Sequence, residues 1–128
     1  MRISFLAFLL TAATLAAAEE TPVSTETFRA YAEGWTLYFE EDGEPFGAEA
    51  FRRDGTVTWK PEGGPCIDGV WGGDETGRIC FLYPEAMACW RITRDGDGKI
   101  ARMEDGSLEI RIVGRDRRPL VCGDEPAI

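Results

Sequence analysis

Apolar and polar residues alternate along residues 34–113, and short turn signals interrupt the alternation at regular intervals. Alternation with a period of two is typical of β-strands that bury one face. Three interruptions are the dipeptides Asp42-Gly43, Asp54-Gly55 and Asp105-Gly106. Each is typical of a two-residue hairpin turn with both central residues at positive φ. The pattern predicts about eight strands, at residues 34–41, 45–53, 56–60, 67–72, 77–83, 86–94, 98–104 and 107–113.

Each predicted hairpin can be tested by the residue pairs that its turn creates. Centring the first on Asp42-Gly43 pairs Leu37 with Ala48 on an apolar face and leaves Glu49 on the outer face. Centring the second on Asp54-Gly55 also keeps Glu49 outside, where it meets Lys60. Apolar pairs inside and opposite charges outside favour these registers.

The third hairpin follows the same rule and completes the architecture. Centring it on Asp105-Gly106 pairs Ala101 with Ile110 inside and sets Arg102 opposite Glu109 outside. Consecutive strands joined by tight turns form an antiparallel meander. A meander of this size most economically closes into a small all-β barrel, which removes its sheet edges. A two-sheet sandwich is the alternative.

A short helix is predicted before the first strand. Ser24 or Thr25 can cap its start, and Gly34 ends it. Phe28 and Tyr31 lie three positions apart on this helix, so they share a face. We expect that face to plug one end of the barrel.

Two cysteines stand symmetrically about a turn in the segment RICFLYPEAMACWR, residues 78–91. Bending the segment at Pro84-Glu85 sets Cys80 opposite Cys89 at a non-hydrogen-bonded pair. The backbones of such a pair approach closely enough for a disulfide. The hairpin and its register therefore predict the bridge Cys80–Cys89.

The two other cysteines are then paired by elimination. Cys66–Cys122 would tie the C-terminal tail, residues 114–128, back to the middle of the chain. The four cysteines lack the close-spaced pairs of a zinc site, so we expect no metal. Two disulfides indicate folding in an oxidising compartment.

The N-terminal segment, residues 1–18, has a minimal basic start and ends in three alanines. This is typical of a secretory signal peptide, with cleavage expected after Ala18. A membrane anchor is the alternative, but the 16-residue apolar run from Ile3 to Ala18 is shorter than the roughly 20 residues that cross a bilayer. We expect a soluble product, periplasmic or secreted, without membrane contact after cleavage. It would comprise an N-terminal segment at 19–33, the barrel domain at 34–113 and the tail.

Charge and composition narrow the possible functions. Acidic residues outnumber basic ones by 23 to 14, and the formal net charge is −9. This argues against nucleic acid or an anionic membrane as a partner. The chain has no histidine, which excludes histidine-based catalytic triads and imidazole metal sites. We expect no catalytic residue and no cofactor, and hence a protein that is not an enzyme.

A resemblance supports the barrel. A short helix followed by Gly34-x-x-Leu37-x-Phe39, with Trp35 on the first strand, is similar to the lipocalin-related (calycin) barrels. The chain more closely resembles small exported bacterial proteins of unknown function, through Phe51-Arg52-Arg53-Asp54-Gly55-Thr56-Val57, then Gly69-Val70-Trp71 and two cysteines on a hairpin. The likeness covers residues 34–104 and implies a stapled eight-strand barrel with a shallower cup than in true lipocalins. Periplasmic inhibitors of proteases and lysozymes share this general plan.

Three features could bind a ligand or partner. Large aromatic residues are expected to face inward, where they either line a pocket or, more simply, fill it, because an eight-strand barrel is only just wide enough for its side chains. These residues are Trp35, Phe39, Phe46, Trp59, Trp71, Phe81 and Trp90.

The second feature is Arg52. It is expected on the apolar face beside Val57, either stacked on a rim tryptophan or meeting a ligand carboxylate.

The third feature is basic. Arg115, Arg117 and Arg118 form the one basic cluster of an acidic chain, with Asp116 between them. The cluster either docks an anionic partner or is a solvated loop.

Two functions are therefore expected. The first is an exported interaction module of unknown specificity, inhibitor-like toward a protein partner. It would use the segment from Glu19 to Ala32, the patch from Leu82 to Met87, or a barrel rim. The alternative is a carrier that holds a small apolar ligand in the barrel interior, for which a cavity of a few hundred Å³ would be the sign.

Overall fold

The structure is a computed structural model that describes residue 7, residues 9–13 and residues 19–123. The predicted signal peptide and its cleavage site lie largely outside the described residues. Among the described residues, no helix is long and apolar enough to cross a membrane.

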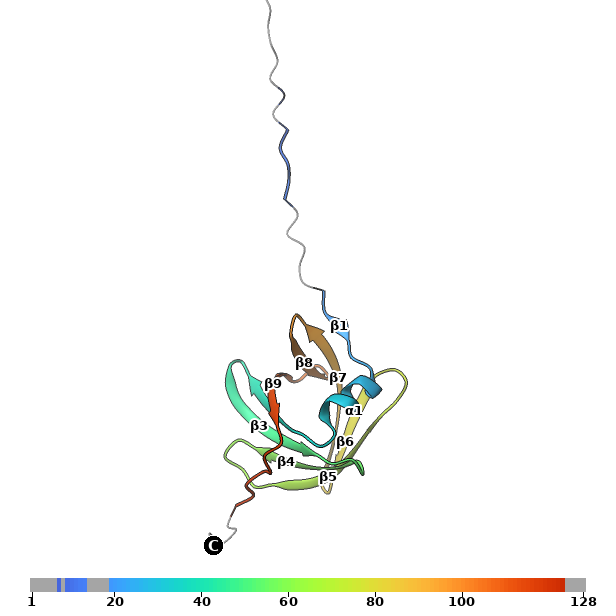
Figure 1. The fold of residues 1–128 in the computed structure, drawn as a ribbon, viewed down its shortest axis with the longest axis vertical. Coiled ribbons are helices and arrows are strands. Elements are labelled where there is room, and N and C mark those ends of the chain that lie inside the picture. Colours follow the sequence, from blue (N-terminus) through green and yellow to red (C-terminus); the bar gives the residue numbers. More distant parts are fainter. Residues whose placement is uncertain (1–6, 8, 14–18, 124–128) are drawn as a thin grey trace, which may run out of the picture.

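Eight strands form a closed antiparallel barrel (Figure 1). The ring follows the order β7-β6-β5-β4-β3-β2-β9-β8, and pairing of β7 with β8 closes it. This confirms the predicted all-β barrel over the sandwich. The strands are β2 (Thr36–Glu41), β3 (Glu44–Phe51), β4 (Thr56–Pro61), β5 (Ile67–Gly73), β6 (Arg78–Tyr83), β7 (Ala86–Asp95), β8 (Gly98–Met103) and β9 (Glu109–Asp116).

A ninth, two-residue strand was not expected from the sequence. This strand, β1 (Thr21–Pro22), pairs antiparallel with Thr93 and Arg94 of β7. The first half of β7 pairs with β6 and its second half with β8. β1 therefore pairs with β7 on the same side as β6, beyond the point where the β6–β7 pairing ends.

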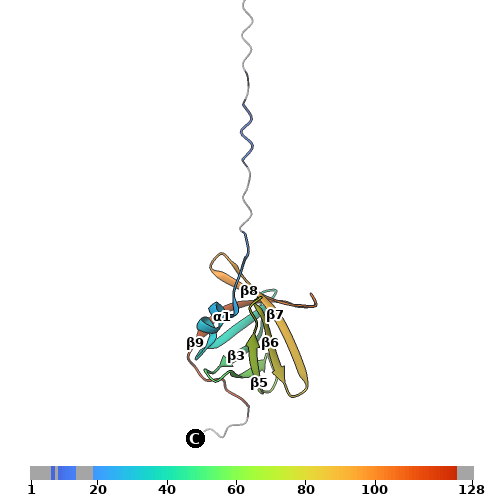
Figure 2. The same cartoon turned by 90° about the vertical axis from the view of Figure 1, so that its right-hand side faces the viewer.

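The helix α1 (Thr25–Ala32) closes one end of the barrel, as predicted. The Ser24 side chain caps it by accepting a hydrogen bond from the backbone N–H of Thr27, and Gly34 follows at φ +81°. Figure 2 shows α1 beside β8 and β9. Phe28 is only 1% exposed and points into the barrel, where it packs edge-on against Phe51 and Trp71. It forms the floor of the interior.

The first hairpin has the predicted turn but not the predicted register. Asp42 and Gly43 both have positive φ, 48° and 81°, as a type I′ turn requires. A β-bulge between Phe39 and Glu40 then shifts the pairing by one residue, so that Leu37 lies opposite Glu49. Because a one-residue shift moves side chains to the other face, Glu49 points inward, and its predicted outer position was wrong.

The register of the second hairpin also places Glu49 on the inner face. Phe51 pairs with Val57 and Glu49 with Trp59, so the loop is one residue longer than the predicted two-residue turn. In this loop only Gly55 has positive φ. Glu49 therefore does not meet Lys60 outside, and both neighbouring strands place it in the interior.

The two remaining registers are confirmed. Cys80 lies opposite Cys89, and Ala101 opposite Ile110. At the β8–β9 turn only Gly106, and not Asp105, has positive φ. The Met103 carbonyl accepts a hydrogen bond from Gly106, so the turn is longer than the predicted type I′ turn although its register is the same.

Both predicted disulfides are present. Cys66–Cys122 has a Cα–Cα distance of 5.3 Å and Cys80–Cys89 one of 4.1 Å. The tail reaches Cys66 after passing β2, where the Thr36 hydroxyl donates to the Arg118 carbonyl. These bridges are consistent with an oxidising, exported location.

Candidate functional site

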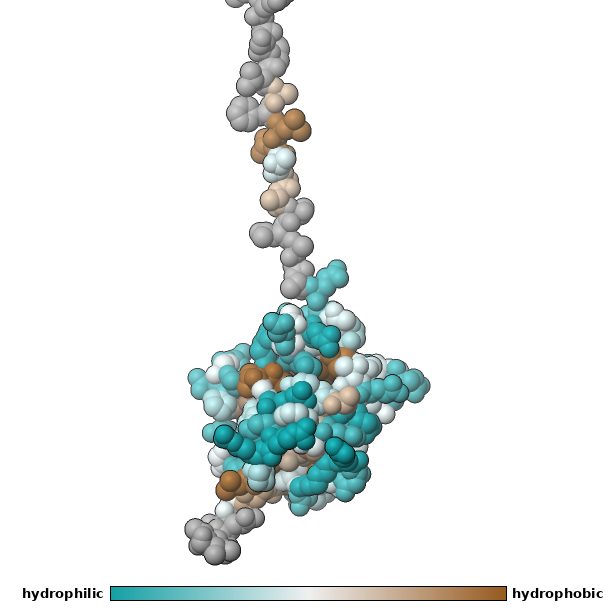
Figure 3. All heavy atoms as spheres, in the orientation of Figure 1, coloured by the Kyte–Doolittle hydropathy of each residue, from teal (hydrophilic) through white to brown (hydrophobic). Residues whose placement is uncertain are grey.

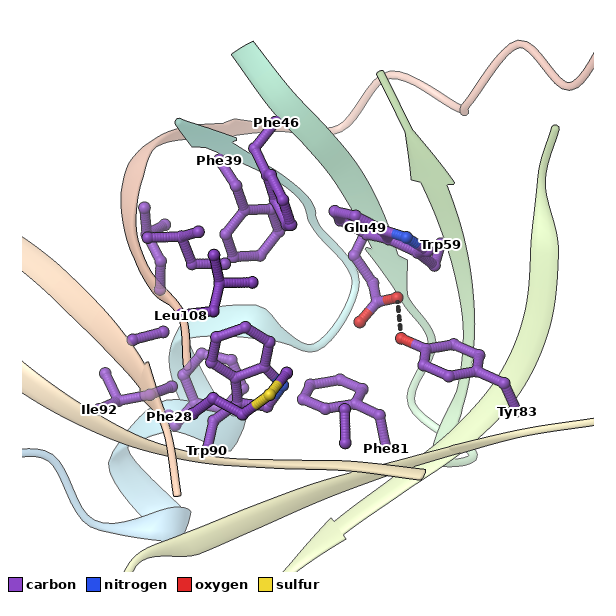
Figure 4. Close-up of a pocket in the computed structure, with 15 residues that line it drawn as sticks. Phe28, Phe39, Phe46, Glu49, Trp59, Phe81, Tyr83, Trp90, Ile92 and Leu108 are labelled. Carbon is purple, nitrogen blue, oxygen red and sulfur yellow. Dashed lines mark hydrogen bonds between the residues drawn. The ribbon is translucent and has the colours of Figure 1, made fainter. Parts of the chain in front are cut away.

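The barrel interior contains a cavity of about 220 Å³ (Figure 4). The cavity overturns the simpler expectation that the inward aromatic residues fill the barrel. Its lining is almost wholly apolar, and comprises Phe28, Phe39, Phe46, Glu49, Trp59, Phe81, Tyr83, Ala88, Trp90, Ile92, Ala101, Met103, Leu108, Ile110 and Ile112.

The cavity runs from the helix end of the barrel toward the opposite end. Phe28 of α1 is its buried floor. Lining residues from the far ends of the strands, among them Phe46, Trp59, Met103 and Leu108, are only half-buried. The cavity therefore comes closest to solvent at the end away from α1.

Two glycines make room for the large side chains of this wall. A Cβ at Gly47 would overlap the ring of Trp59 and lie 2.6 Å from the Lys60 carbonyl oxygen. A Cβ at Gly69 would lie 2.6 Å from the ring of Tyr83. Trp59 and Tyr83 thus occupy space that any larger residue at these two positions would take.

The polar feature of the cavity is a carboxyl–hydroxyl pair. Glu49 is 3% exposed, and its Oε2 accepts a hydrogen bond of 2.7 Å from the Tyr83 hydroxyl. Among the residues that line the cavity there is no lysine or arginine, and Glu49 is the only carboxyl. The carboxyl therefore faces an apolar space without a cation to balance its charge.

Burial governs the ionisation of this pair. It raises the pKa of Glu49 from 4.5 to about 8, although the hydrogen bond from Tyr83 acts in the opposite direction. Burial, and then the Glu49 carboxyl, also raise the pKa of Tyr83. At neutral pH the cavity therefore holds a carboxyl group that is mostly protonated.

Sequence reasoning missed both members of the pair. A signal for Glu49 was nevertheless present, because Arg53-Asp54-Gly55 can form a three-residue loop with glycine in the left-handed position. That loop pairs Phe51 with Val57, two apolar residues, and places Glu49 on their inner face. The apolar pair is a better guide to register here than the dipeptide.

The four tryptophans that were predicted to face the interior lie at different sites. Trp59 and Trp90 line the cavity. Trp71 packs against Phe28 below the cavity, with the Arg29 guanidinium 4.5 Å from its ring centroid. Trp35 is not a lining residue, which corrects the expectation that it faces the pocket.

Trp35 instead joins the predicted basic cluster. The guanidinium carbons of Arg115 and Arg117 lie 4.0 Å and 4.1 Å from its ring centroid. Arg115 also stacks on Tyr31, whose ring centroid lies 3.7 Å from the Lys99 ammonium. These cations and rings form an outer stack beside the helix.

Arg118 and Asp116 do not extend this outer stack. The Asp116 carboxylate accepts hydrogen bonds from the Tyr38 hydroxyl and from the Arg118 backbone. No ion pair of Asp116 with a neighbouring arginine is found within the described residues. Asp116 therefore lies between the arginines in sequence without forming an ion pair with them in the described part of the chain.

Arg52 does not lie where the predicted register put it. Phe51, and not Arg52, pairs with Val57. The Arg52 guanidinium donates hydrogen bonds to Thr58 and Thr56, and its side chain is exposed. It stacks on no tryptophan within the described part of the chain, so the expected rim contact was wrong.

One apolar feature lies on the outside of the barrel. Val70, Leu82 and Met87 are directly paired across β5, β6 and β7, and are 48%, 55% and 66% exposed. We call these three residues the outer apolar row. The face of the molecule drawn in Figure 3 is largely hydrophilic, with apolar residues gathered in small spots.

Comparison with protein-family models, curated proteins and solved structures gave no match for this chain. Among the described residues no cluster of three or more acidic or cysteine side chains is arranged to hold a metal ion.

Proposed function

We propose that this protein is an exported, disulfide-stabilised binding protein that holds a small, mainly apolar ligand inside its barrel. The observation that carries the proposal is the cavity of about 220 Å³ with an apolar lining and a single polar pair. Ligand sites are typically concave and apolar, with a few placed polar groups that orient the ligand. The cavity has each of these properties.

The size of the cavity limits the ligand. A cavity of about 150 Å³ with an aliphatic and aromatic lining takes up benzene. The present cavity is larger, so it suits one ring or a short alkyl chain with a terminal polar group. We propose binding and not catalysis, because Glu49 is the only carboxyl of the lining, whereas glycoside hydrolysis uses two opposed carboxyls.

Blocking the cavity tests this proposal. The Ala88→Phe variant adds a ring to the lining, whereas Met87→Phe adds one to the exposed side of the same strand. Toluene should change the fluorescence of the wild-type protein and of Met87→Phe, because Trp59 and Trp90 line the cavity. It should not change that of Ala88→Phe. Equal responses of the two variants, or no response from wild type, would contradict the proposal.

The outer apolar row favours a second function, as an interaction module with a protein partner. Exposed apolar side chains that adjoin one another are typical of interaction surfaces. The double variant Leu82→Ser/Met87→Ser should then lose a partner that wild type captures from periplasmic extract. The cavity variant Ala88→Phe is the control, since it leaves the row unchanged.

A further inference from the structure

We propose that the ligand is a small organic amine whose ammonium group pairs with Glu49 and whose apolar body fills the remaining cavity. This inference rests on the proposed function, because it names the chemical class of the ligand. Its basis is the placement of an unbalanced carboxyl among aromatic rings at the wall of an apolar cavity.

The geometry of the carboxyl leaves one oxygen for a ligand. Oε2 of Glu49 accepts the hydrogen bond from Tyr83, and Oε1 has no hydrogen-bond partner among the residues drawn in Figure 4. This oxygen keeps accessible surface, so a ligand in the cavity can donate a hydrogen bond to it, and a bond from a charged donor is stronger than one from a neutral donor. The cavity therefore favours a donor at this position over a purely apolar molecule.

A cluster of aromatic rings begins beside the same carboxyl (Figure 4). Trp59 lies directly opposite Glu49 in the β3–β4 pairing, and its ring packs edge-on against Phe39 at 5.8 Å and tilted against Phe46 at 5.6 Å. Tyr83 adds a ring on another side of the carboxyl (Figure 4). Aromatic faces attract cations and give no such advantage to anions or alcohols. The rings and the carboxyl thus both favour a positively charged group on the ligand.

The lining itself supplies no cation. Glu49 and Tyr83 are its only titratable residues, and β2 and β4, which flank Glu49, contribute Phe39 and Trp59. Pairing a buried carboxylate with an ammonium inside the cavity balances the charge that the protein leaves unbalanced. The apolar body of the amine then buries against the aliphatic residues of β7, β8 and β9.

Ionisation makes the inference testable through pH. In the free protein the pKa of Glu49 is about 8, so below pH 8 an ammonium must displace the carboxyl proton in order to pair. Affinity for an amine should rise by up to about tenfold per pH unit from pH 6 to pH 8. It should then level off until the amine itself loses its proton, near pH 10.4 for an alkylammonium of the lysine type.

Three matched probes test the inference by isothermal titration calorimetry: hexylamine, 1-hexanol and hexanoate. At pH 8.5 wild type should prefer hexylamine to 1-hexanol and bind hexanoate weakest. The Glu49→Gln variant should lose about tenfold or more of its hexylamine affinity and change its 1-hexanol affinity by less than about twofold. Glu44→Gln, on an exposed residue of the same strand, is the control and should match wild type.

The possible results separate the inference from the proposed function. If wild type binds 1-hexanol as tightly as hexylamine, or if Glu49→Gln keeps its preference for the amine, the amine inference is overturned while cavity binding remains. If no probe binds wild type, both fall. Should Glu49→Gln fail to fold, the wild-type pH series decides alone. A rising hexylamine affinity with a flat 1-hexanol affinity supports the inference, and two parallel profiles overturn it.

Discussion

The Tyr83 hydroxyl and the Glu49 carboxyl are hydrogen-bonded at 2.7 Å although their strands, β6 and β3, are separated by β4 and β5 around the ring. The bond therefore joins two parts of the curved wall across the interior. It fixes the orientation of a carboxyl that no cation of the lining balances. The pair makes the interior chemically specific where apolar residues alone would offer only size and shape.

The raised pKa of Glu49 predicts that stability falls as pH rises. Between 4.5 and about 8 the folded protein keeps a proton that the unfolded chain releases. The contribution of Glu49 is therefore fully present below pH 4.5, and is lost by about 1.4 kcal/mol per pH unit up to about pH 8. Urea unfolding of wild type and Glu49→Gln at pH 5, 6, 7 and 8 measures the difference. Curves that stay parallel across this range would contradict the prediction.

Replacing Gly47 should destabilise the barrel. The Gly47→Ala variant places a methyl group against the Trp59 ring and the Lys60 carbonyl, and overpacking of this kind costs about 1–3 kcal/mol. Gly72→Ala is a matched control on another strand, because a Cβ there meets nothing within 4 Å. Chemical denaturation compares the two, and equal losses would show that Gly47 makes no special room for Trp59.

The outer stack should contribute a small but measurable coupling energy. Arg117 lies over Trp35, and exposed contacts between a guanidinium and an indole are worth about 0.5–1 kcal/mol. A double-mutant cycle with Trp35→Leu and Arg117→Gln isolates this interaction from other effects of each substitution. Strictly additive losses would indicate that the stack adds nothing to stability.

The two disulfides should differ in their effect on stability. Cys66–Cys122 spans 56 positions and Cys80–Cys89 spans 9. Chain entropy then gives losses of about 4 and about 2.5 kcal/mol when each pair is replaced by alanine. Guanidinium unfolding of the two double variants tests the order. A larger loss for the shorter loop would contradict it.

The local sequence pattern was sufficient to predict the strand register of the regular hairpins. The pairing of Cys80 with Cys89, and of Ala101 with Ile110, follows from symmetrical turns between alternating segments. It was insufficient at the Phe39/Glu40 bulge, since a bulge inserts one residue without a strong sequence signal. That single residue decides the face of Glu49, so the fold could be predicted while its most distinctive side chain was misplaced.

The cavity could not be predicted from the alternation of apolar and polar residues, for a different reason. Alternation says which residues face inward, but not whether their volumes fill the ring that they enclose. Trp59 and Phe81 were both expected inside and both are, yet a space remains between them and the residues of β8 and β9. The size of that space depends on strand tilt and ring orientation, which only the assembled structure determines.

The short strand β1 covers part of a strand edge of the barrel. Thr21 and Pro22 pair with the part of β7 that β6 leaves uncovered. An uncovered strand edge is a template for another chain. A chain trimmed beyond Pro22 would present such an edge at Thr93 and Arg94, so we expect it to associate with a second chain more readily than a chain that keeps β1.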